Sequence, residues 1–114
     1  MSKMYSPDRG DAVWLNFSPK AGHEQSGRRP AVVVSPKAYN REVGLGLFCP
    51  ITSQIKGYPF EVLIPAGISI SGVVLSGQMK SLDWQVRDAQ FISKFPVSTM
   101  SEVLKKLGTL LKDR

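Results

Sequence analysis

Short strand-like segments separated by turn residues most restrict what this chain can form. Residues 11–17 alternate apolar and polar side chains, whereas residues 31–35 are almost entirely apolar and typical of a buried strand. Further strands are predicted at residues 45–49, 60–64, 72–76 (running on toward 82) and 89–95. Many short strands with Gly and Pro between them predict a mainly β fold, a small and strongly curved barrel.

Two helices are predicted among these strands. Ser35 as the N-cap and Pro36 at the first helical position predict a short helix over residues 37–42, ended by Gly44. Near the C-terminus, Thr99 and Glu102 fit a capping box. Apolar residues then recur every three or four positions: Met100, Val103, Leu104, Leu107, Leu110 and Leu111. This C-terminal α-helix is expected to cover one end of the sheet, with Gly108 allowing close packing.

Length and composition bound the class of protein. The 114 residues predict a single domain over 1–114. Cys49 is the only cysteine, which excludes an internal disulfide and favours the cytoplasm, and its apolar neighbours indicate a core residue. No signal peptide or membrane span is predicted. The net charge of +6 favours a polyanionic partner, either nucleic acid or an acidic protein, although solubility alone also explains it.

Residues 22–30, between the first two strands, concentrate the polar chemistry. They contain the only histidine, His23, followed by Glu24, Gln25, Arg28 and Arg29. The connection exceeds the roughly two to five residues that are usual in a hairpin, and long loops on rigid strands often carry function. Pro30 restricts the residue before it to an extended backbone, which suits a guanidinium held for a fixed phosphate contact.

Most catalytic chemistries have no support in this sequence. One histidine, one cysteine and dispersed carboxylates make no zinc-type ligand set, and no glycine-rich phosphate loop precedes a helix. We therefore expect no metal and no cofactor. A Ser-His-Asp hydrolase would have to use His23 as its base, and nothing places a serine against it.

The remaining constellation is Glu24, Arg29 and Thr52. Cleaving RNA without a metal requires activation of the 2′-OH, stabilisation of charge on the phosphorus centre and assistance to the leaving 5′-oxygen. Arginine binds phosphate oxygens through two parallel hydrogen bonds, a carboxylate accepts a proton, and a threonine hydroxyl donates a hydrogen bond. Taken singly, each of the three is also explained as an ordinary solvated loop or turn residue.

The segment from Glu24 to Val33 resembles the E-Q-x-G-x-R-P signature of the MazF/PemK/Kid toxins. Other stretches match that family in order, nearly to the end of the chain: residues 7–11, 35–36, 39–40, 50–54, 56–61 and 72–75. The resemblance implies the toxin of a type II toxin–antitoxin pair: a metal-independent endoribonuclease that cuts single-stranded mRNA at a short motif, through a 2′,3′-cyclic phosphate, and arrests translation. It also implies an SH3-like barrel of the CcdB/MazF type, a homodimer, and an acidic, MazE-like antitoxin as partner.

The resemblance also implies roles for particular residues. Arg29 and Thr52 match the catalytic pair, and Glu24 matches the loop glutamate. The residues expected to bind RNA are Asn16, His23, Gln25, Arg28, Ser53, Gln54, Lys56, Tyr58, Gln78 and Lys80, with Tyr58 and Trp84 as candidates for base stacking. In several relatives an aspartate precedes the glutamine that Gln78 matches, whereas this chain has Gly77. The general base is therefore Glu24, or the 2′-OH is activated mainly by Arg29.

Two other functions stay open at this stage. A CcdB-like gyrase poison would share the fold without cleaving RNA, and it needs neither Glu24 beside Arg29 nor a threonine facing that arginine. A non-catalytic RNA-binding barrel would use the same basic loops.

Overall fold

The computed structural model describes residues 5–17 and 27–113. Seven strands are present in these ranges: β1 (Asp11–Asn16), β2 (Arg28–Val33), β3 (Leu45–Thr52), β4 (Glu61–Leu63), β5 (Val73–Leu75), β6 (Lys80–Asp83) and β7 (Gln90–Lys94). The helices are α2 (Lys37–Val43), the short 3₁₀ helix η1 (Ser76–Gln78) and α3 (Val97–Leu110).

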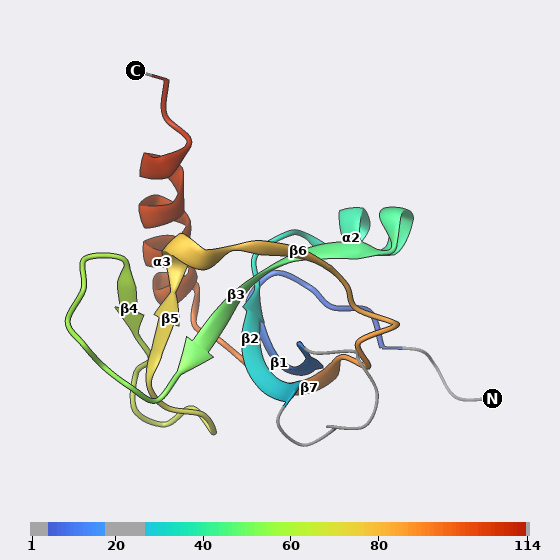
Figure 1. Cartoon of the computed structure of the whole chain (residues 1–114), viewed down its shortest axis with the longest axis horizontal. Coiled ribbons are helices and arrows are strands. Elements are labelled where there is room, and N and C mark those ends of the chain that lie inside the picture. Colours follow the sequence, from blue (N-terminus) through green and yellow to red (C-terminus); the bar gives the residue numbers. More distant parts are fainter. Residues whose placement is uncertain (1–4, 18–26, 114) are drawn as a thin grey trace.

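The strands form one antiparallel, strongly curved sheet (Figure 1). Its main order is β4-β5-β3-β2-β1-β7, with β6 paired to β3 alone, so β4, β6 and β7 are edge strands and the sheet is open in the part of the chain that is described. The long strand β3 pairs with β6 through its first half and with β5 through its end. The prediction of a mainly β fold with a C-terminal helix is confirmed, whereas the fifth predicted strand is interrupted at η1 and resumes as the separate strand β6.

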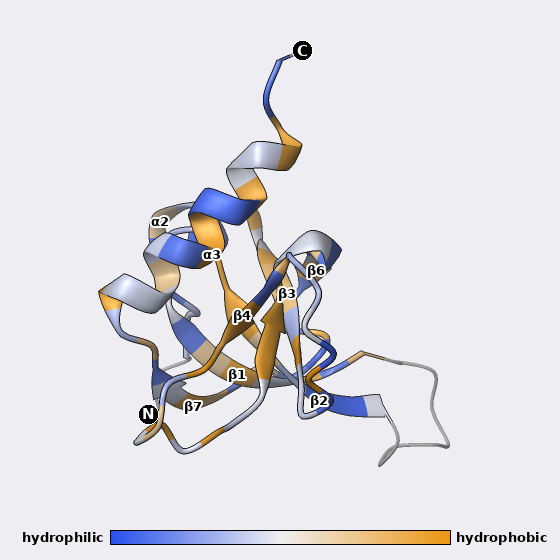
Figure 2. Cartoon of the chain, turned by 90° about the vertical axis from the view of Figure 1, so that its left-hand side faces the viewer, coloured by the Kyte–Doolittle hydropathy of each residue, from blue (hydrophilic) through white to orange (hydrophobic). Residues whose placement is uncertain are grey.

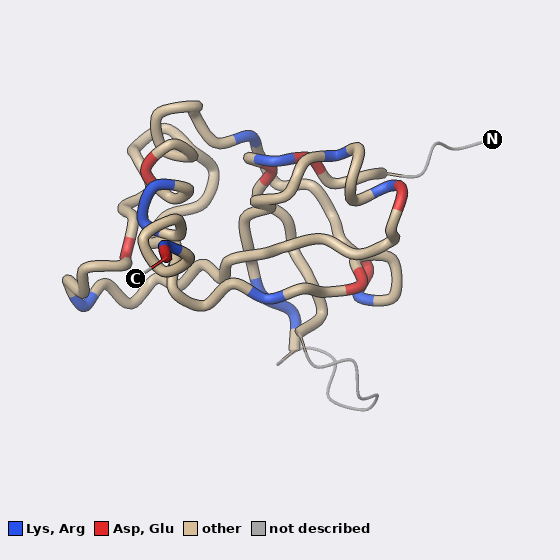
Figure 3. The backbone as a smooth tube through the Cα atoms, turned by 90° about the horizontal axis from the view of Figure 1, so that it is seen from above, with Lys and Arg blue, Asp and Glu red and all other residues tan. Residues whose placement is uncertain are grey.

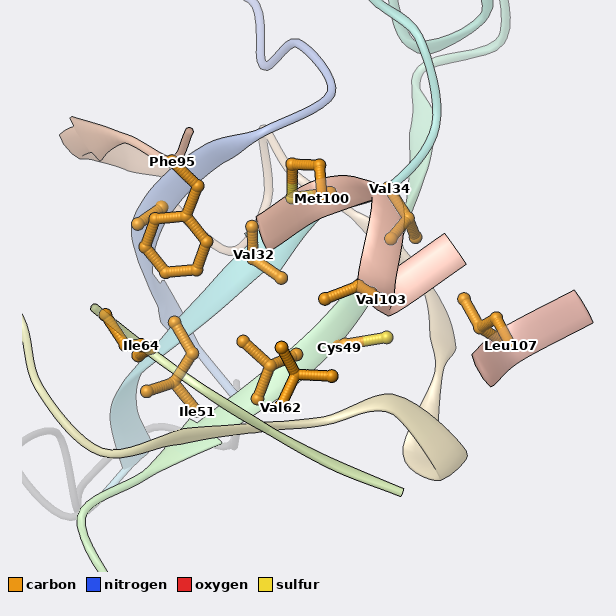
Figure 4. Packing of buried hydrophobic residues seen from close by; sticks show 12 residues of the cluster. Val32, Val34, Cys49, Ile51, Val62, Ile64, Phe95, Met100, Val103 and Leu107 are labelled. Atoms are coloured by element: carbon orange, nitrogen blue, oxygen red, sulfur yellow. The ribbon is translucent and has the colours of Figure 1, made fainter. Parts of the chain in front are cut away.

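The sheet is buried on both faces where β1, β2 and β3 lie side by side. On one face α3, β4 and β5 cover Val32, Val34 and Cys49 (Figure 4), while on the other β6 and the chain after it cover Ala31, Val33 and Phe48. Successive side chains of a strand point to opposite faces, so a strand with two covered faces is apolar throughout. This explains the continuous apolar run of residues 31–34, which begins in the second half of β2.

The helix α3 packs on the sheet through an apolar stripe of Met100, Val103 and Leu107, as the periodicity predicts (Figures 2 and 4). The predicted capping box is wrong, because α3 begins at Val97 after Pro96 and Thr99 is buried inside its first turn. Glu102 pairs instead with Lys106 at 3.6 Å. The explanation of Gly108 by close packing is also wrong, since a Cβ there would meet no atom within 4 Å among the described residues.

The helix α2 ends at Gly44 in the left-handed conformation (φ 82°), as predicted. Its N-cap is Pro36 rather than Ser35. The Ser35 hydroxyl is used elsewhere, because it donates to Oδ1 of Asn40 at 2.5 Å and accepts the N–H of Leu47 at 2.8 Å. No side-chain hydrogen bond caps the start of α2.

Cys49 lies in the core, as its neighbours predict, and is fully buried. Burial raises the pKa of its thiol to about 12, because the thiolate has no water around it. The described helices include none that is long and apolar enough to cross a membrane.

Candidate active site

Arg29 and Thr52, predicted from distant parts of the sequence, line one cavity of about 440 Å³. The pairing of β2 with β3 explains why they meet. Ala31 is the partner of Pro50, and continuing this antiparallel register by two residues brings Arg29 opposite Thr52. The other lining residues are Trp14, Pro30, Ile51, Ser53, Ser69, Ile70, Ser71 and Ile92.

The side chain of Arg29 is exposed and makes no hydrogen bond or ion pair with the residues that the structure describes. It follows Arg28 on a strand, where successive side chains point to opposite faces. Figure 3 shows basic, blue backbone close to where the segment drawn in grey rejoins the described chain. An exposed guanidinium without a partner keeps its donors for a ligand, and carboxylates and phosphates are the groups that fit its planar fork.

Thr52 ends β3, and its hydroxyl is oriented by the turn that follows. Its Oγ1 accepts the backbone N–H of Gln54 at 3.2 Å. A hydroxyl that already accepts one hydrogen bond still has its own proton to donate. Thr52 can therefore donate a hydrogen bond into the cavity that it shares with Arg29.

The backbone of Thr52 is held from the other side by Gly72. This glycine has a φ of +118°, and a Cβ at its position would overlap the carbonyl oxygen of Thr52. Only glycine combines that backbone conformation with so close an approach. Gly72 thus allows the loop between β4 and β5 to pack directly behind the end of β3.

Thr52 also lines a second cleft of about 200 Å³, together with Gln54, Lys56, Tyr58, Glu61, Leu75 and Gln78. Four of the predicted RNA-binding residues are thereby brought around Thr52. The carboxylate of Glu61 organises this cleft, because it accepts the N–H of Lys56 at 3.2 Å and of Gly57 at 2.9 Å. The Lys56 ammonium lies 5.9 Å from the centre of the exposed Tyr58 ring.

Other predicted RNA-binding residues lie in different surroundings. Arg28 and Asn16 bind each other, with Nη1 of the arginine 3.0 Å from Oδ1 of the asparagine. The Lys80 ammonium lies 5.9 Å from the centre of the Phe17 ring. The stacking role of Trp84 is wrong, since this residue is buried and its Nε1 donates to the carbonyl oxygen of Asn40 at 3.2 Å.

Ser53 is exposed and lines the first cavity beside Thr52. The predictions for His23, Glu24 and Gln25 lie outside the described residues. Gly77 belongs to η1, and a Cβ on it would be 3.7 Å from Cβ of Phe60, an ordinary contact. A side chain would thus fit there, so the absence of an aspartate is a difference of chemistry and not of space.

Sequence reasoning missed two kinds of supporting residue. Glu61 organises its cleft through contacts four and five positions away, which turn residues near it could have suggested. Arg87 and Asp88 hold β1 and β2 from about 60 or 70 positions away in sequence, which no local pattern indicates. The residues described contain no group of three or more His, Cys, Asp or Glu that could hold a metal ion.

Known proteins resemble this chain in both sequence and fold. The family model of the PemK-like, MazF-like toxins of type II toxin–antitoxin systems matches residues 8–111. The endoribonuclease toxin MazF of Escherichia coli K12 is 49% identical over 89 residues, covering 78% of this chain and 79% of that protein. The crystal structure of MazF from Deinococcus radiodurans superimposes with a TM-score of 0.86 at 56% identity, covering 95% of this chain and 98% of the other.

A crystal structure of MazE–MazF from Deinococcus radiodurans also matches, with a TM-score of 0.86 at 49% identity over 97% of this chain and 100% of the other. The fold of this small, mainly β chain is thus shared with solved structures of MazF toxins. This chain belongs to the PemK-like, MazF-like toxin family of type II toxin–antitoxin systems. The family predicted from the sequence is confirmed.

Proposed function

We propose that this chain is an endoribonuclease that cuts single-stranded RNA at the cavity of Arg29 and Thr52, as the toxin of a toxin–antitoxin pair. The observation that carries the proposal is that an exposed guanidinium, without a partner among the described residues, lines the same cavity as a hydroxyl free to donate. The names of the relatives, endoribonuclease MazF among them, support the same activity.

The chemistry follows from the two groups. The 2′-oxygen attacks the neighbouring phosphorus, its proton passes to a base, and the bond to the 5′-oxygen breaks. The products are a 2′,3′-cyclic phosphate and a 5′-hydroxyl, whose oxygen takes up a proton. Arg29 and Thr52 donate hydrogen bonds to the phosphate oxygens where negative charge develops, and this stabilises the transition state. No metal is required in such a scheme.

The recognition of RNA uses the cleft on the other side of Thr52. Gln54, Lys56, Tyr58 and Gln78 provide amide, cationic and aromatic groups around one concave surface. Unpaired bases stack on aromatic rings and are read by hydrogen bonds along their edges. A single strand lying from one cavity to the other would thus place its phosphate at Arg29 and the adjoining bases in the cleft.

The proposed partners are RNA and an acidic antitoxin of the MazE type, with the toxin acting as a homodimer. The net charge of +6 favours both ligands by the same electrostatics. The match to a MazE–MazF complex supports an antitoxin of this kind.

The test is the digestion of a long unstructured RNA by the purified protein in excess EDTA, with the cut ends mapped. We expect cuts at one short motif that leave 5′-hydroxyl ends. Cleavage that disappears with EDTA and returns with Mg²⁺ would contradict the metal-free scheme. Folded protein, free of antitoxin, that binds RNA without cutting it would be a binding module, and one without affinity for RNA would point to a protein target such as gyrase.

Replacing Glu24 by glutamine tests the general base. Glu61 is the only carboxylate among the described residues that line the two clefts, and it is already bound to loop amides. If Glu24 is the base, its loss lowers the cleavage rate about 100-fold or more and removes the rise of the rate with pH near the pKa of the carboxylate. A Glu24→Gln variant that keeps the rate and pH profile of the wild type would assign the activation of the 2′-OH to Arg29.

A further inference from the structure

The bend between β6 and β7 holds both strands that flank residues 18–26. Nη1 of Arg87 donates to the carbonyl oxygens of Asn16 at 3.1 Å and Phe17 at 2.9 Å, and the carbonyl of Arg87 accepts the N–H of Asn16 at 2.9 Å. The two flanks also meet directly, because the N–H of Phe17 donates to the carbonyl oxygen of Gly27 at 2.6 Å. Arg87 thus fixes the end of β1 immediately before residues 18–26.

Arg28 fixes the other flank. Its Nη2 donates to the carbonyl oxygen of Asp88 at 2.8 Å and lies 3.8 Å from the carboxylate of the same residue. Its Nη1 donates to Oδ1 of Asn16 at 3.0 Å. The side chain is only 25% exposed. Arg28 and Arg29 are neighbours with opposite surroundings, since the donors of the first are used within the protein and those of the second have no partner among the described residues.

The bend itself is well ordered by its own contacts. The carboxylate of Asp83 accepts the N–H groups of Gln85 at 3.1 Å and Val86 at 3.0 Å, and the buried Trp84 anchors the bend to the core. Asp88 has a φ of 55°, in the left-handed region that residues other than glycine seldom adopt. The surroundings hold this residue in that conformation, and it is the one whose carbonyl receives Arg28.

We propose that Arg28 and Arg87 are positioning residues and that Arg28 does not bind RNA. The two arginines clamp the chain on either side of residues 18–26, and this sets the place of Arg29 against Thr52. The inference rests on the proposed RNA cleavage at Arg29, and it replaces the RNA-binding role expected for Arg28 and Asn16. A backbone anchored on both strands needs no reordering when RNA arrives. Misplacing a catalytic group by about 1 Å costs roughly 100-fold in rate, which is the scale of effect expected here.

The decisive experiment compares Arg28→Gln with Arg41→Gln, which removes the same charge from the exposed face of α2. Steady-state cleavage is measured on an RNA oligonucleotide carrying the mapped motif. Binding is measured against salt with the same oligonucleotide bearing a 2′-deoxy group at the attacking nucleotide. For Arg28→Gln we expect kcat to fall about tenfold to 100-fold, with the slope of log affinity against log salt unchanged from that of Arg41→Gln.

A direct phosphate contact by Arg28 would give the opposite pattern. The salt slope would then fall by about 0.7, the value for one contact to single-stranded nucleic acid, while kcat changed little. That result would overturn the proposal. Asn16→Ala removes one partner of Arg28 without changing the charge. The proposal would also be overturned if this variant left kcat unaltered.

Lysine variants give a second, independent readout. Arg87 uses one nitrogen for both of its carbonyl contacts, so Arg87→Lys should keep most of the kcat that Arg87→Ala loses. Arg28 spreads its contacts over two nitrogens, so Arg28→Lys should behave like Arg28→Gln. If Arg28→Lys cleaved as the wild type does, charge alone would be sufficient and the clamp would be refuted.

Amide hydrogen exchange separates this inference from the proposed function. We expect Arg87→Ala to speed exchange at Asn16 and Phe17 at least tenfold relative to Val86→Ala, an exposed position in the same bend. If the wild type proves unable to cut RNA, the proposed function fails while the exchange result still decides whether the clamp exists. Unchanged exchange at both amides would overturn the clamp.

Discussion

Replacing Arg29 by alanine is expected to lower the rate of RNA cleavage about 1,000-fold or more while leaving the fold intact. The guanidinium is exposed and makes no hydrogen bond or ion pair with the described residues, so its removal costs the folded state little, within about 0.5 kcal/mol. Its proposed task is confined to the transition state, where losing a donor to a charged oxygen typically costs about 100- to 1,000-fold and losing an arginine on phosphorus more. The measurement is single-turnover cleavage alongside thermal unfolding.

Two variants serve as controls for Arg29→Ala. Arg41→Ala removes the same charge at an exposed position of α2 and should cleave normally. Arg29→Lys keeps the charge but not the planar fork, so we expect an intermediate rate. An Arg29→Ala protein that cut within about threefold of the wild-type rate would refute the proposed site, whatever its affinity for RNA.

Replacing Gly72 by alanine is expected to destabilise the protein by about 2–5 kcal/mol and to impair cleavage in whatever protein still folds. Two costs combine: about 1–2 kcal/mol for a side chain at positive φ, and about 1–3 kcal/mol for the overlap with the carbonyl oxygen of Thr52. Relief of the overlap moves either the loop or the end of β3, and the second displaces the threonine hydroxyl. Denaturant unfolding and cleavage rate are the two measurements.

Gly67 provides the matched control in the same loop. Its φ is +93°, but a Cβ there would meet nothing within 4 Å in the described part of the chain. Gly67→Ala therefore carries the conformational cost of about 1–2 kcal/mol without the overlap, and cleavage should be unaffected. Equal stability losses in the two variants would show that the contact with Thr52 is unimportant.

Local patterns were sufficient to predict most of the elements of this fold. The alternation of β1, the apolar run of β2 and the three-and-four spacing of α3 each reflect which faces are covered. The start of α2 at residue 37 was predicted correctly, but the N-caps of both helices were wrong, since Ser35 bonds to Asn40 and Leu47 and Thr99 is buried within α3. β6 was merged with the strand before it, because pairing with the first half of β3 is a long-range contact that no local pattern reveals.

The candidate site likewise contains residues that could be predicted from the sequence and residues that could not. Arg29 and Thr52 were predicted from residue type and resemblance, and the structure brings them to one cavity. The resemblance assigns Arg29 to catalysis, but no local pattern shows that the donors of Arg28 are used within the protein. Their difference comes from Asp88, which is 60 residues away. The role of Gly72 could not be predicted either, because its close approach to Thr52 exists only in the folded chain.

The place of the proposed catalytic pair on strands β2 and β3 has a consequence for how such a toxin can be inhibited. Both strands have neighbours on each side, whereas β4, β6 and β7 each pair with a single strand. Local opening in proteins begins at edges and termini. Loosening β4, β6 or β7 therefore leaves the pairing of β2 with β3 in place, and we expect an inhibitor that only distorts such an edge to leave the proposed site intact. We expect an effective inhibitor to occupy the cleft itself.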